Sequence, residues 1–265
     1  MASGSRKHLQ IMRLGVGLLL PLVAFLGCTT TGKPAQSTAT APKSGGPQES
    51  SRGVTTALPV TPLQELPAGY TLDTRVQKDA ARNYTATLHV PRAVDDAAFN
   101  LVMDAFVRQQ VEAEQPDADA TEATTLEVWI LEARVTGQVT QWLFRAQSYT
   151  EGAAHYNHGF LTLNYDAPGK KQVLFTDLFV FSKGPTAQAF CDLINRHEQG
   201  LEAGETPNGG LTPQELGAKL NFEVRDQKLV IYPNRCCADE GKTHGLDLST
   251  VKAFLDPAVA GNFGL

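Results

Sequence analysis

Apolar and polar side chains alternate along several short segments of the chain, and this alternation predicts β-strands. Residues 82–90 place an apolar side chain at every second position, and Pro91 is expected to end that strand. Residues 126–133 and 139–149 are rich in β-branched and aromatic side chains and flank Gly137. They are therefore expected to form a hairpin of two long strands.

Two other segments repeat their apolar side chains every three or four residues, which is the period of a helix facing a core. The first predicted helix covers residues 96–114, and Asp95 or Asp96 is its expected N-cap. The second covers residues 186–202, and Ser249 is expected to cap a last short helix. The core positions of the first helix are predicted to be Phe99, Val102, Met103, Phe106 and Val111.

Two further hairpins are predicted in the second half of the chain. Residues 160–165 and 173–175 alternate in polarity and are joined across 167–170, where Pro and Gly preset turn dihedrals. Residues 221–225 and 228–232 form the other pair. The expected fold class is therefore α+β, a mostly antiparallel β-sheet with the two main helices packed on it.

The folded part of the chain is expected to be a domain of residues 69–265. Residues 28–68 are rich in Thr, Ser, Pro and Ala and have few large apolar groups. Such a segment cannot bury enough surface to offset its ordering entropy, so it is interpreted as a disordered tether.

Residues 1–27 have the pattern of a bacterial lipoprotein signal peptide. A basic start is followed by an apolar run over 14–26 and by Gly27-Cys28. The run is shorter than the ~20 residues that a membrane-spanning helix needs. An ordinary secretory signal is the alternative, and Met12 is an alternative start to Met1, since residues 12–28 form a complete signal.

Cleavage before Cys28 predicts a lipid-anchored protein of the bacterial cell envelope. Acyl chains on that cysteine would hold the chain on a membrane. Thr29 follows the cysteine, which favours the outer membrane, facing the periplasm, in a Gram-negative host.

The expected mature chain is acidic. Residues 1–27 contain three basic and no acidic side chains, so 20 Lys and Arg remain against 28 Asp and Glu. This balance argues against nucleic acid as a partner and favours a basic one. Between Gln109 and Ala133 there is no Lys or Arg, and Glu112, Glu114 and Asp117 open an acidic segment that could bind a cationic partner.

Three cysteines remain after Cys28, namely Cys191, Cys236 and Cys237. Export would place them in an oxidising compartment where thiols tend to pair. A bridge from Cys191 to Cys236 or Cys237 is favoured over a bridge between the two adjacent cysteines. One thiol is left over in either case, since three is an odd number.

The loop of residues 151–158 holds the best candidate for chemistry. Glu151, His155 and His158 could meet one metal ion, with the glutamate as a third ligand or a base. The HExxH pattern is absent, however, and so are GxSxG and glycine-rich phosphate loops. We therefore expect no catalysis, no cofactor and no metal. The other interpretation of the loop is structural, with Gly152 allowing close backbone approach and His155 bonding across the sheet.

This region resembles a known family signature. In the RsiV-like domain family, DUF3298, a Gly-Gly-Ala-His loop precedes an aspartate, a Gly-Lys turn and a segment ending in Asp-Leu-Phe. Ala153 replaces the second loop glycine, and the C-terminal strands keep the family outline except around Cys236 and Cys237. The matching signature residues are Gly152, Ala154, His155, Asp166, Gly169, Lys170, Leu174, Asp177, Leu178 and Phe179.

The resemblance implies a binding or sensing module. Some family members recognise lysozyme, and others are joined to a separate catalytic domain. The predicted function is therefore a membrane-tethered lipoprotein that binds lysozyme, another cell-wall hydrolase or a cell-wall component. Its expected binding residues are Glu112, Glu114, Asp117, Glu151, Gly152, His155 and His158. The alternatives are a metal-dependent envelope hydrolase and a structural lipoprotein that binds peptidoglycan.

Overall fold

The computed structural model describes residues 61–180, 187–201, 205–208, 210–213, 216, 220–232 and 244–265. The predicted signal peptide, Cys28 and most of the predicted tether lie outside these residues, as do Cys236 and Cys237. In the part that is described, no helix is long and apolar enough to cross a membrane.

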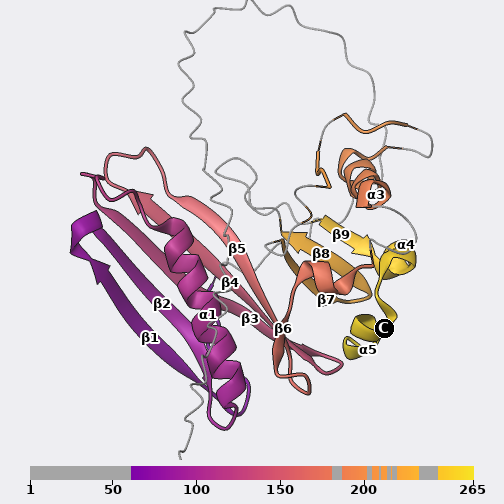
Figure 1. Cartoon of the computed structure of the whole chain (residues 1–265), viewed down its shortest axis with the longest axis horizontal. Coiled ribbons are helices and arrows are strands. Elements are labelled where there is room, and N and C mark those ends of the chain that lie inside the picture. Colours follow the sequence, from indigo (N-terminus) through magenta and orange to yellow (C-terminus); the bar gives the residue numbers. More distant parts are fainter. Residues whose placement is uncertain are drawn as a thin grey trace, which may run out of the picture. The chain divides into compact units, whose positions relative to one another are not determined.

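The larger sheet has six strands in the order β1-β2-β3-β4-β5-β6. Neighbouring strands are antiparallel except β2 and β3, which are parallel. Parallel neighbours need a crossover connection, and helix α1 (Ala97–Glu114) supplies it and lies on one face of the sheet (Figure 1). The strands are β1 (Tyr70–Asp79), β2 (Tyr84–Ala93), β3 (Thr124–Thr136), β4 (Val139–Thr150), β5 (Asn157–Asp166) and β6 (Lys171–Val173).

A second sheet has three strands in the order β7-β8-β9. The sequence predicted one sheet, whereas the structure has two. Helix α3 contacts β9 of the second sheet, and its buried side chains belong to a cluster that also includes Val139 and Val173 of the larger sheet. Alternation identifies strands but not which strands pair. The remaining elements are η1 (Ala80–Arg82), α2 (Phe175–Leu178), α3 (Ala187–Gln199), β7 (Asn221–Arg225), β8 (Lys228–Tyr232), β9 (His244–Asp247), α4 (Leu248–Val251), η2 (Lys252–Phe254) and α5 (Pro257–Asn262).

Polar side chains join the two sheets. The Gln141 amide on β4 accepts from the backbone N–H of Val224 at 2.7 Å and donates to the carbonyl of the same residue at 2.7 Å. Asn164 on β5 donates to the carbonyl of Phe222 at 2.9 Å. These bonds satisfy backbone groups of β7 that would otherwise be buried without partners.

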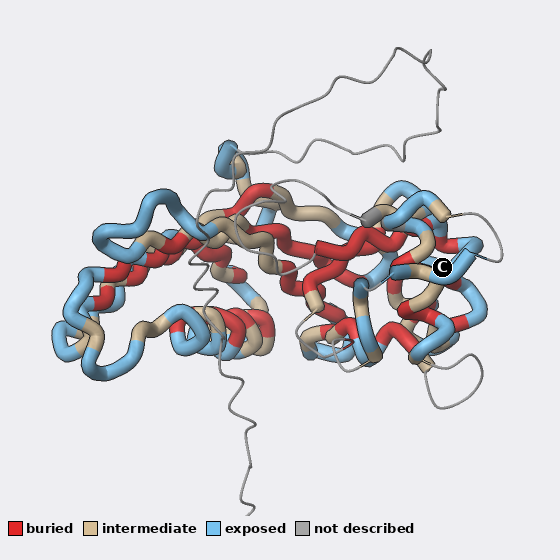
Figure 2. Tube along the Cα trace, turned by 90° about the horizontal axis from the view of Figure 1, so that it is seen from above, coloured by how far each residue is buried: buried red, intermediate tan, exposed pale blue. Residues whose placement is uncertain are grey.

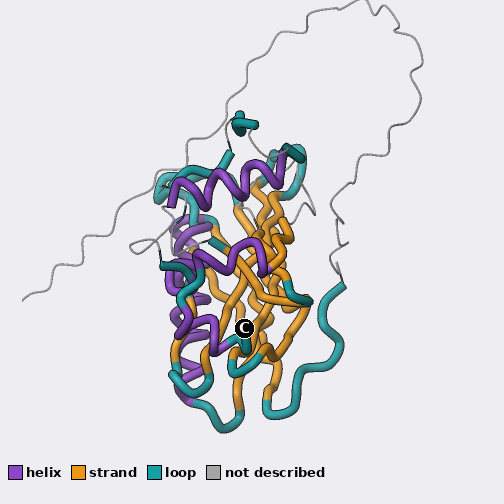
Figure 3. Tube along the Cα trace, turned by 90° about the vertical axis from the view of Figure 1, so that its right-hand side faces the viewer, coloured by secondary structure: helices purple, strands orange, loops and turns teal. Residues whose placement is uncertain are grey.

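The two main apolar clusters lie on the two sheets. The first fills the space between α1 and the larger sheet and includes Phe99, Met103 and Trp142, each at most 1% exposed. The second surrounds Phe175, Phe190 and Phe222. Buried positions alternate with exposed ones along the strands (Figure 2), and the helices lie mainly on one side of the strands (Figure 3).

The packed chain begins before residue 69, the boundary expected from composition. The backbone N–H of Leu63 donates to the carbonyl of Ile130 at 2.8 Å, and the side chains of Leu63 and Leu66 pack against the cluster under α1. The parallel pairing of β2 with β3 stops at Leu88 and Val128, which leaves this carbonyl for another partner.

The predicted α+β class is confirmed, and most predicted elements are present. Four details differ. Strand β1 was not predicted, and β2 continues past Pro91 because its pairing with β3 has already ended there. Phe175 begins a helical turn instead of ending a strand, since Asp177 accepts from the N–H of Leu174. The N-cap position of α4 is Asp247, not Ser249.

Candidate functional site

The two loops predicted to bind meet at one end of the larger sheet. The backbone N–H of Glu151 donates to the carbonyl of Ala123 at 2.8 Å, and the Thr124 and Thr150 hydroxyls lie 3.1 Å apart. The loop after α1 therefore lies beside the loop between β4 and β5 (Figure 1). We call this surface the acidic end, because it collects the exposed side chains of Glu112, Glu114, Asp117, Asp119, Glu122 and Glu151.

Local contacts leave the acidic end negatively charged. Arg82, on the adjacent η1, is held by Asp79 at 2.7 Å, and this hydrogen bond lowers the pKa of Asp79. Hydrogen bonds from its own backbone and from the Thr121 hydroxyl lower the pKa of Glu122. Burial raises the pKa of Tyr84, and the nearby charge of Glu114 raises it further. The carboxylate of Glu122 thus stays ionised at neutral pH.

The carboxylates of α1 lie at the unfavourable end of its dipole. Glu112 and Glu114 occupy the last turn, which contains no basic side chain. The helix C-terminus carries a partial negative charge, so acidic side chains there destabilise the helix. The position of these two glutamates therefore lowers the stability of the helix, and a role in binding would explain why they are there.

The loop of residues 151–156 does not have the structural role that one of its two interpretations gave it. Gly152 has a φ of +85°, but a Cβ there would meet nothing within 4 Å, so its glycine serves the turn and not a close backbone approach. His155 is exposed, and its ring nitrogen lies 3.3 Å from the carbonyl of the adjacent Tyr156 instead of reaching across the sheet.

Glu151, His155 and His158 do not form the metal site considered from the sequence. Among the described residues, no group of three His, Cys, Asp or Glu side chains is placed to hold a metal ion. The rings of His158 and Tyr156 are stacked with their centroids 6.2 Å apart. The ring centroids of Tyr156 and Tyr149 are 4.8 Å apart. The sequence did not reveal this aromatic cluster, because its members come from a strand end and a loop.

The aspartates of the signature shape turns. Asp166 is 3% exposed, accepts from the N–H of Gly169 at 3.1 Å and from the Asn262 amide at 3.1 Å. A side chain at Gly169 would collide with that carboxylate. Asp177 caps α2, and Leu178 and Phe179 enter the core. These residues position the loops but are not themselves a binding site.

Cys191 is fully buried on α3. Its two predicted bridge partners lie outside the described residues.

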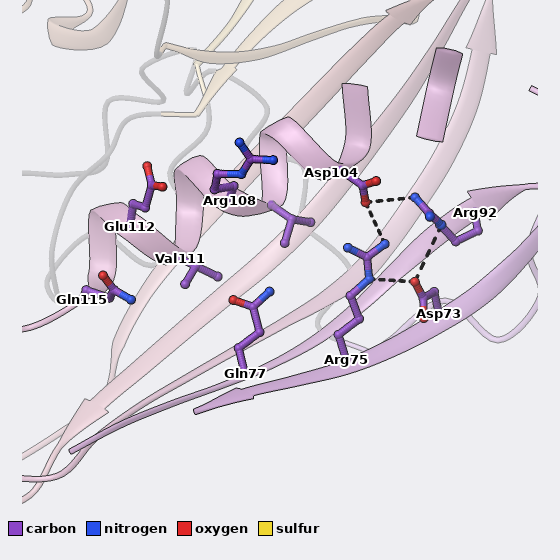
Figure 4. A pocket seen from close by; sticks show the side chains of 10 residues that line it. Asp73, Arg75, Gln77, Arg92, Asp104, Arg108, Val111, Glu112 and Gln115 are labelled. Carbon is purple, nitrogen blue, oxygen red and sulfur yellow. Dashed lines mark hydrogen bonds and ion pairs between the residues drawn. The ribbon is translucent and has the colours of Figure 1, made fainter. Parts of the chain in front are cut away.

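A groove between β1 and α1 opens beside the acidic end (Figure 4). It has a volume of about 600 Å³ and shares Glu112 with the acidic end. Sequence reasoning missed it because β1 was not predicted. Its lining side chains are Asp73, Arg75, Gln77, Arg92, Asp104, Val107, Arg108, Val111, Glu112 and Gln115.

Two arginines and two aspartates close one end of this groove. Arg75 lies 2.7 Å from Asp73 and 2.8 Å from Asp104, and Arg92 lies 2.9 Å from Asp104 and 3.7 Å from Asp73. Burial opposes ionisation of Asp104, but hydrogen bonds from both arginines lower its pKa overall. The network is neutral in total and ties β1 to α1.

Comparisons with known proteins return structures but no named relative. No family model matches the chain, and no curated protein matches it. A DUF3298 family member from Bacteroides fragilis is 10% identical, with a TM-score of 0.42, over 73% of this chain and 96% of that one. A DUF3298 family protein from Pseudomonas aeruginosa is 12% identical, with a TM-score of 0.38, over 76% of this chain and 97% of that one. Both bear the name of the family that residues 151–179 resemble.

Proposed function

We propose that this chain is a non-catalytic binding module that recognises a basic protein through its acidic end. A cell-wall hydrolase such as lysozyme is the partner that the sequence resemblance favours. The observation that carries the proposal is the meeting of the loop after α1 with the loop after β4, which gathers exposed carboxylates that are distant in the sequence.

Charge complementarity acts mainly on the rate of encounter. A surface of one sign attracts a partner of the other sign over roughly a Debye length, which is ~8 Å at physiological salt. Exposed pairs add little affinity once formed, because water and salt screen them. Binding through the acidic end should therefore weaken steeply as salt is added.

Calorimetric titration of the chain with hen lysozyme at low and physiological salt tests the proposal. Saturable binding that weakens with salt is expected. Glu112→Lys combined with Glu114→Lys should weaken binding about tenfold or more. The matched control is Glu65→Lys combined with Asp95→Lys, which makes the same charge change at exposed sites away from the acidic end. Absence of heat at both salts, or equal losses in the two variants, would contradict the proposal.

The proposal includes a lipid anchor on Cys28 in the bacterial envelope. It is supported by the basic start, the short apolar run and the cysteine that follows Gly27. Growth with radiolabelled palmitate should label the parent chain and leave Cys28→Ser unlabelled. Label on the variant would overturn the anchor while leaving the binding proposal open to its own test.

A second candidate function is the binding of cell-wall glycan, favoured by the cluster of Tyr149, Tyr156 and His158. Aromatic faces next to polar groups offer large contact area at low entropic cost. Pull-down by purified sacculi that is lost in Tyr156→Ala, with lysozyme binding unchanged, would support this candidate over the first.

A further inference from the structure

Strand β1 ends the larger sheet and leaves an open edge. Only β2 pairs with it among the described residues. Two large apolar side chains on its outer face are exposed, Leu72 at 56% and Val76 at 58%. Proteins normally protect a long edge strand, since its free backbone groups pair with other chains. This edge has only Lys78 as a charged side chain on the same face.

Along β1, the backbone N–H and carbonyl groups of successive residues point alternately toward β2 and toward the open edge. The N–H of Val94 donates to the carbonyl of Gly69 at 2.9 Å, which makes these two residues a hydrogen-bonded pair. In an antiparallel ladder such pairs recur every second residue, so odd-numbered residues of β1 face β2. Leu72 lies opposite Pro91, which has no N–H to donate, in agreement with this phase. The N–H and carbonyl groups of Leu72, Thr74 and Val76 therefore point to the open edge.

The five residues of this edge are complementary to themselves when two copies run antiparallel, because reversal places the acidic position opposite the basic one. Leu72-Asp73-Thr74-Arg75-Val76 is apolar, acidic, hydroxyl, basic and apolar. We propose that two copies of this chain pair antiparallel through β1, with a two-fold axis at Thr74. Leu72 then lies beside the partner's Val76 and Asp73 beside the partner's Arg75. Such an isologous contact is closed and joins the two larger sheets into one.

The direction of the backbone hydrogen-bonding groups and the pairing of the side chains both favour this register. Thr74 forms a hydrogen-bonded pair with the partner's Thr74, and Leu72 does so with the partner's Val76. Moving the axis to Arg75 would place two arginines opposite each other, and moving it to Asp73 would oppose two aspartates. Like charges directly opposite are destabilising, whereas opposite charges and hydroxyl pairs stabilise.

The charged pair has bonding capacity left for a partner. The ion pairs of Asp73 with Arg75 and Arg92 use only its Oδ2 atom. Arg75 uses Nε toward Asp73 and Nη2 toward Asp104. Among the described residues, Oδ1 of Asp73 and Nη1 of Arg75 make none of the contacts that define these ion pairs. They are the atoms that the second copy would engage.

A charge-swap series measured by sedimentation tests the proposal. The full chain carrying Cys28→Ser is expected to dimerise with increasing micromolar concentration. Leu72→Lys alone and Val76→Glu alone should each weaken the dimer about tenfold, since each alters two symmetry-related contacts. The double variant should recover dimerisation, because each new lysine faces a new glutamate across the axis. Within one strand the two positions are ~13 Å apart, so the recovery cannot arise inside one chain.

Cysteine cross-linking fixes the register. Thr74→Cys should give a disulfide-linked dimer above the parent background, because paired Cα atoms at ~5.5 Å lie within disulfide reach. Thr125→Cys, exposed on β3, is the matched control and should give none. A parent chain that stays monomeric, or a double variant no better than the singles, would overturn the proposal and leave the edge to a strand of another protein.

Discussion

Two aspartates of the family signature accept hydrogen bonds from backbone N–H groups and so fix the shape of turns. Asp166 holds the turn after β5, and Asp177 accepts from the backbone N–H at the start of α2. The signature residues are visible in the sequence, but the structural roles of these two aspartates are not. A sequence shows that an aspartate is present, whereas its hydrogen-bond partners become visible only when Asn262 folds back onto the same turn.

Gly137, in the turn between β3 and β4, has no room for a side chain. Its φ is +61°, and a Cβ there would collide with the backbone of Asn262, Phe263 and Gly264. Gly137→Ala should lower the free energy of unfolding by about 2–3 kcal/mol, since backbone strain and overlap add. Gly159→Ala is the control, because a Cβ at Gly159 meets nothing within 4 Å. Equal denaturation midpoints for the two variants would contradict this.

Glu223 gives the stability an unusual pH dependence. It is 3% exposed, and burial raises its pKa although the Tyr232 hydroxyl at 2.6 Å and Arg225 oppose the shift. The folded chain thus binds this proton more tightly than the unfolded chain does. Its contribution is fully present below the ordinary glutamate pKa of 4.5 and is lost as pH rises through the folded pKa.

Glu223→Gln should therefore reduce the fall in stability above about pH 4.5 seen in urea unfolding of the parent. Asp104→Asn is the counterpart. Because the folded pKa of Asp104 is lowered, its contribution is lost as pH falls. That variant should flatten the acid side of the profile and leave the neutral side alone. Two results would contradict this assignment. Either the stability of the parent does not fall above about pH 4.5, or it falls equally in Glu223→Gln.

At the scale of elements, the helices and long hairpins were predictable, and β1 was not. Its buried-face positions are Asp73 and Arg75, while its apolar Leu72 and Val76 are exposed. A hydrophobic pattern assumes that apolar side chains face the core, and here an ion-pair network faces α1 instead. The groove and the open edge both depend on this strand, so neither could be derived from the sequence.

Replacing the carboxylates in the last turn of α1 should raise the stability of the protein and weaken its binding to lysozyme. Glu112→Lys with Glu114→Lys replaces carboxylates at the negative end of the helix dipole by cations. Thermal unfolding should therefore show a gain of about 1 kcal/mol, while lysozyme binding weakens. The control Glu65→Lys with Asp95→Lys should not gain stability. A variant that loses both stability and binding would point to a folding defect and not to a binding surface.

At the scale of the whole molecule, the number of sheets was the main error. Most strands other than β1 were found, but their division into two sheets was not. Polar side chains of β4 and β5 bind the backbone of β7 where the two sheets meet. Gln141, at 2% exposed, looks in the sequence like any solvent-facing residue of a strand.

Gln141→Leu should leave the backbone N–H of Val224 without its side-chain partner and the carbonyl with only the Thr136 hydroxyl at 3.3 Å. A buried unpaired group costs about 1–3 kcal/mol, so we expect a loss of about 1–3 kcal/mol in urea unfolding. Gln147→Leu, half-buried on the same strand, is the control and should change stability by less than about 1 kcal/mol. Equal small effects would mean that the junction does not depend on this amide.

The central claim, recognition of a basic protein by the acidic end, is tested most directly by the association rate constant for lysozyme as ionic strength is raised. The parent is expected to associate fast at low salt and to slow steeply as salt increases. Glu112→Lys with Glu114→Lys should start slower and show a shallower slope, while dissociation changes little. No association at low salt, or one slope shared by the parent and this variant, would contradict the account.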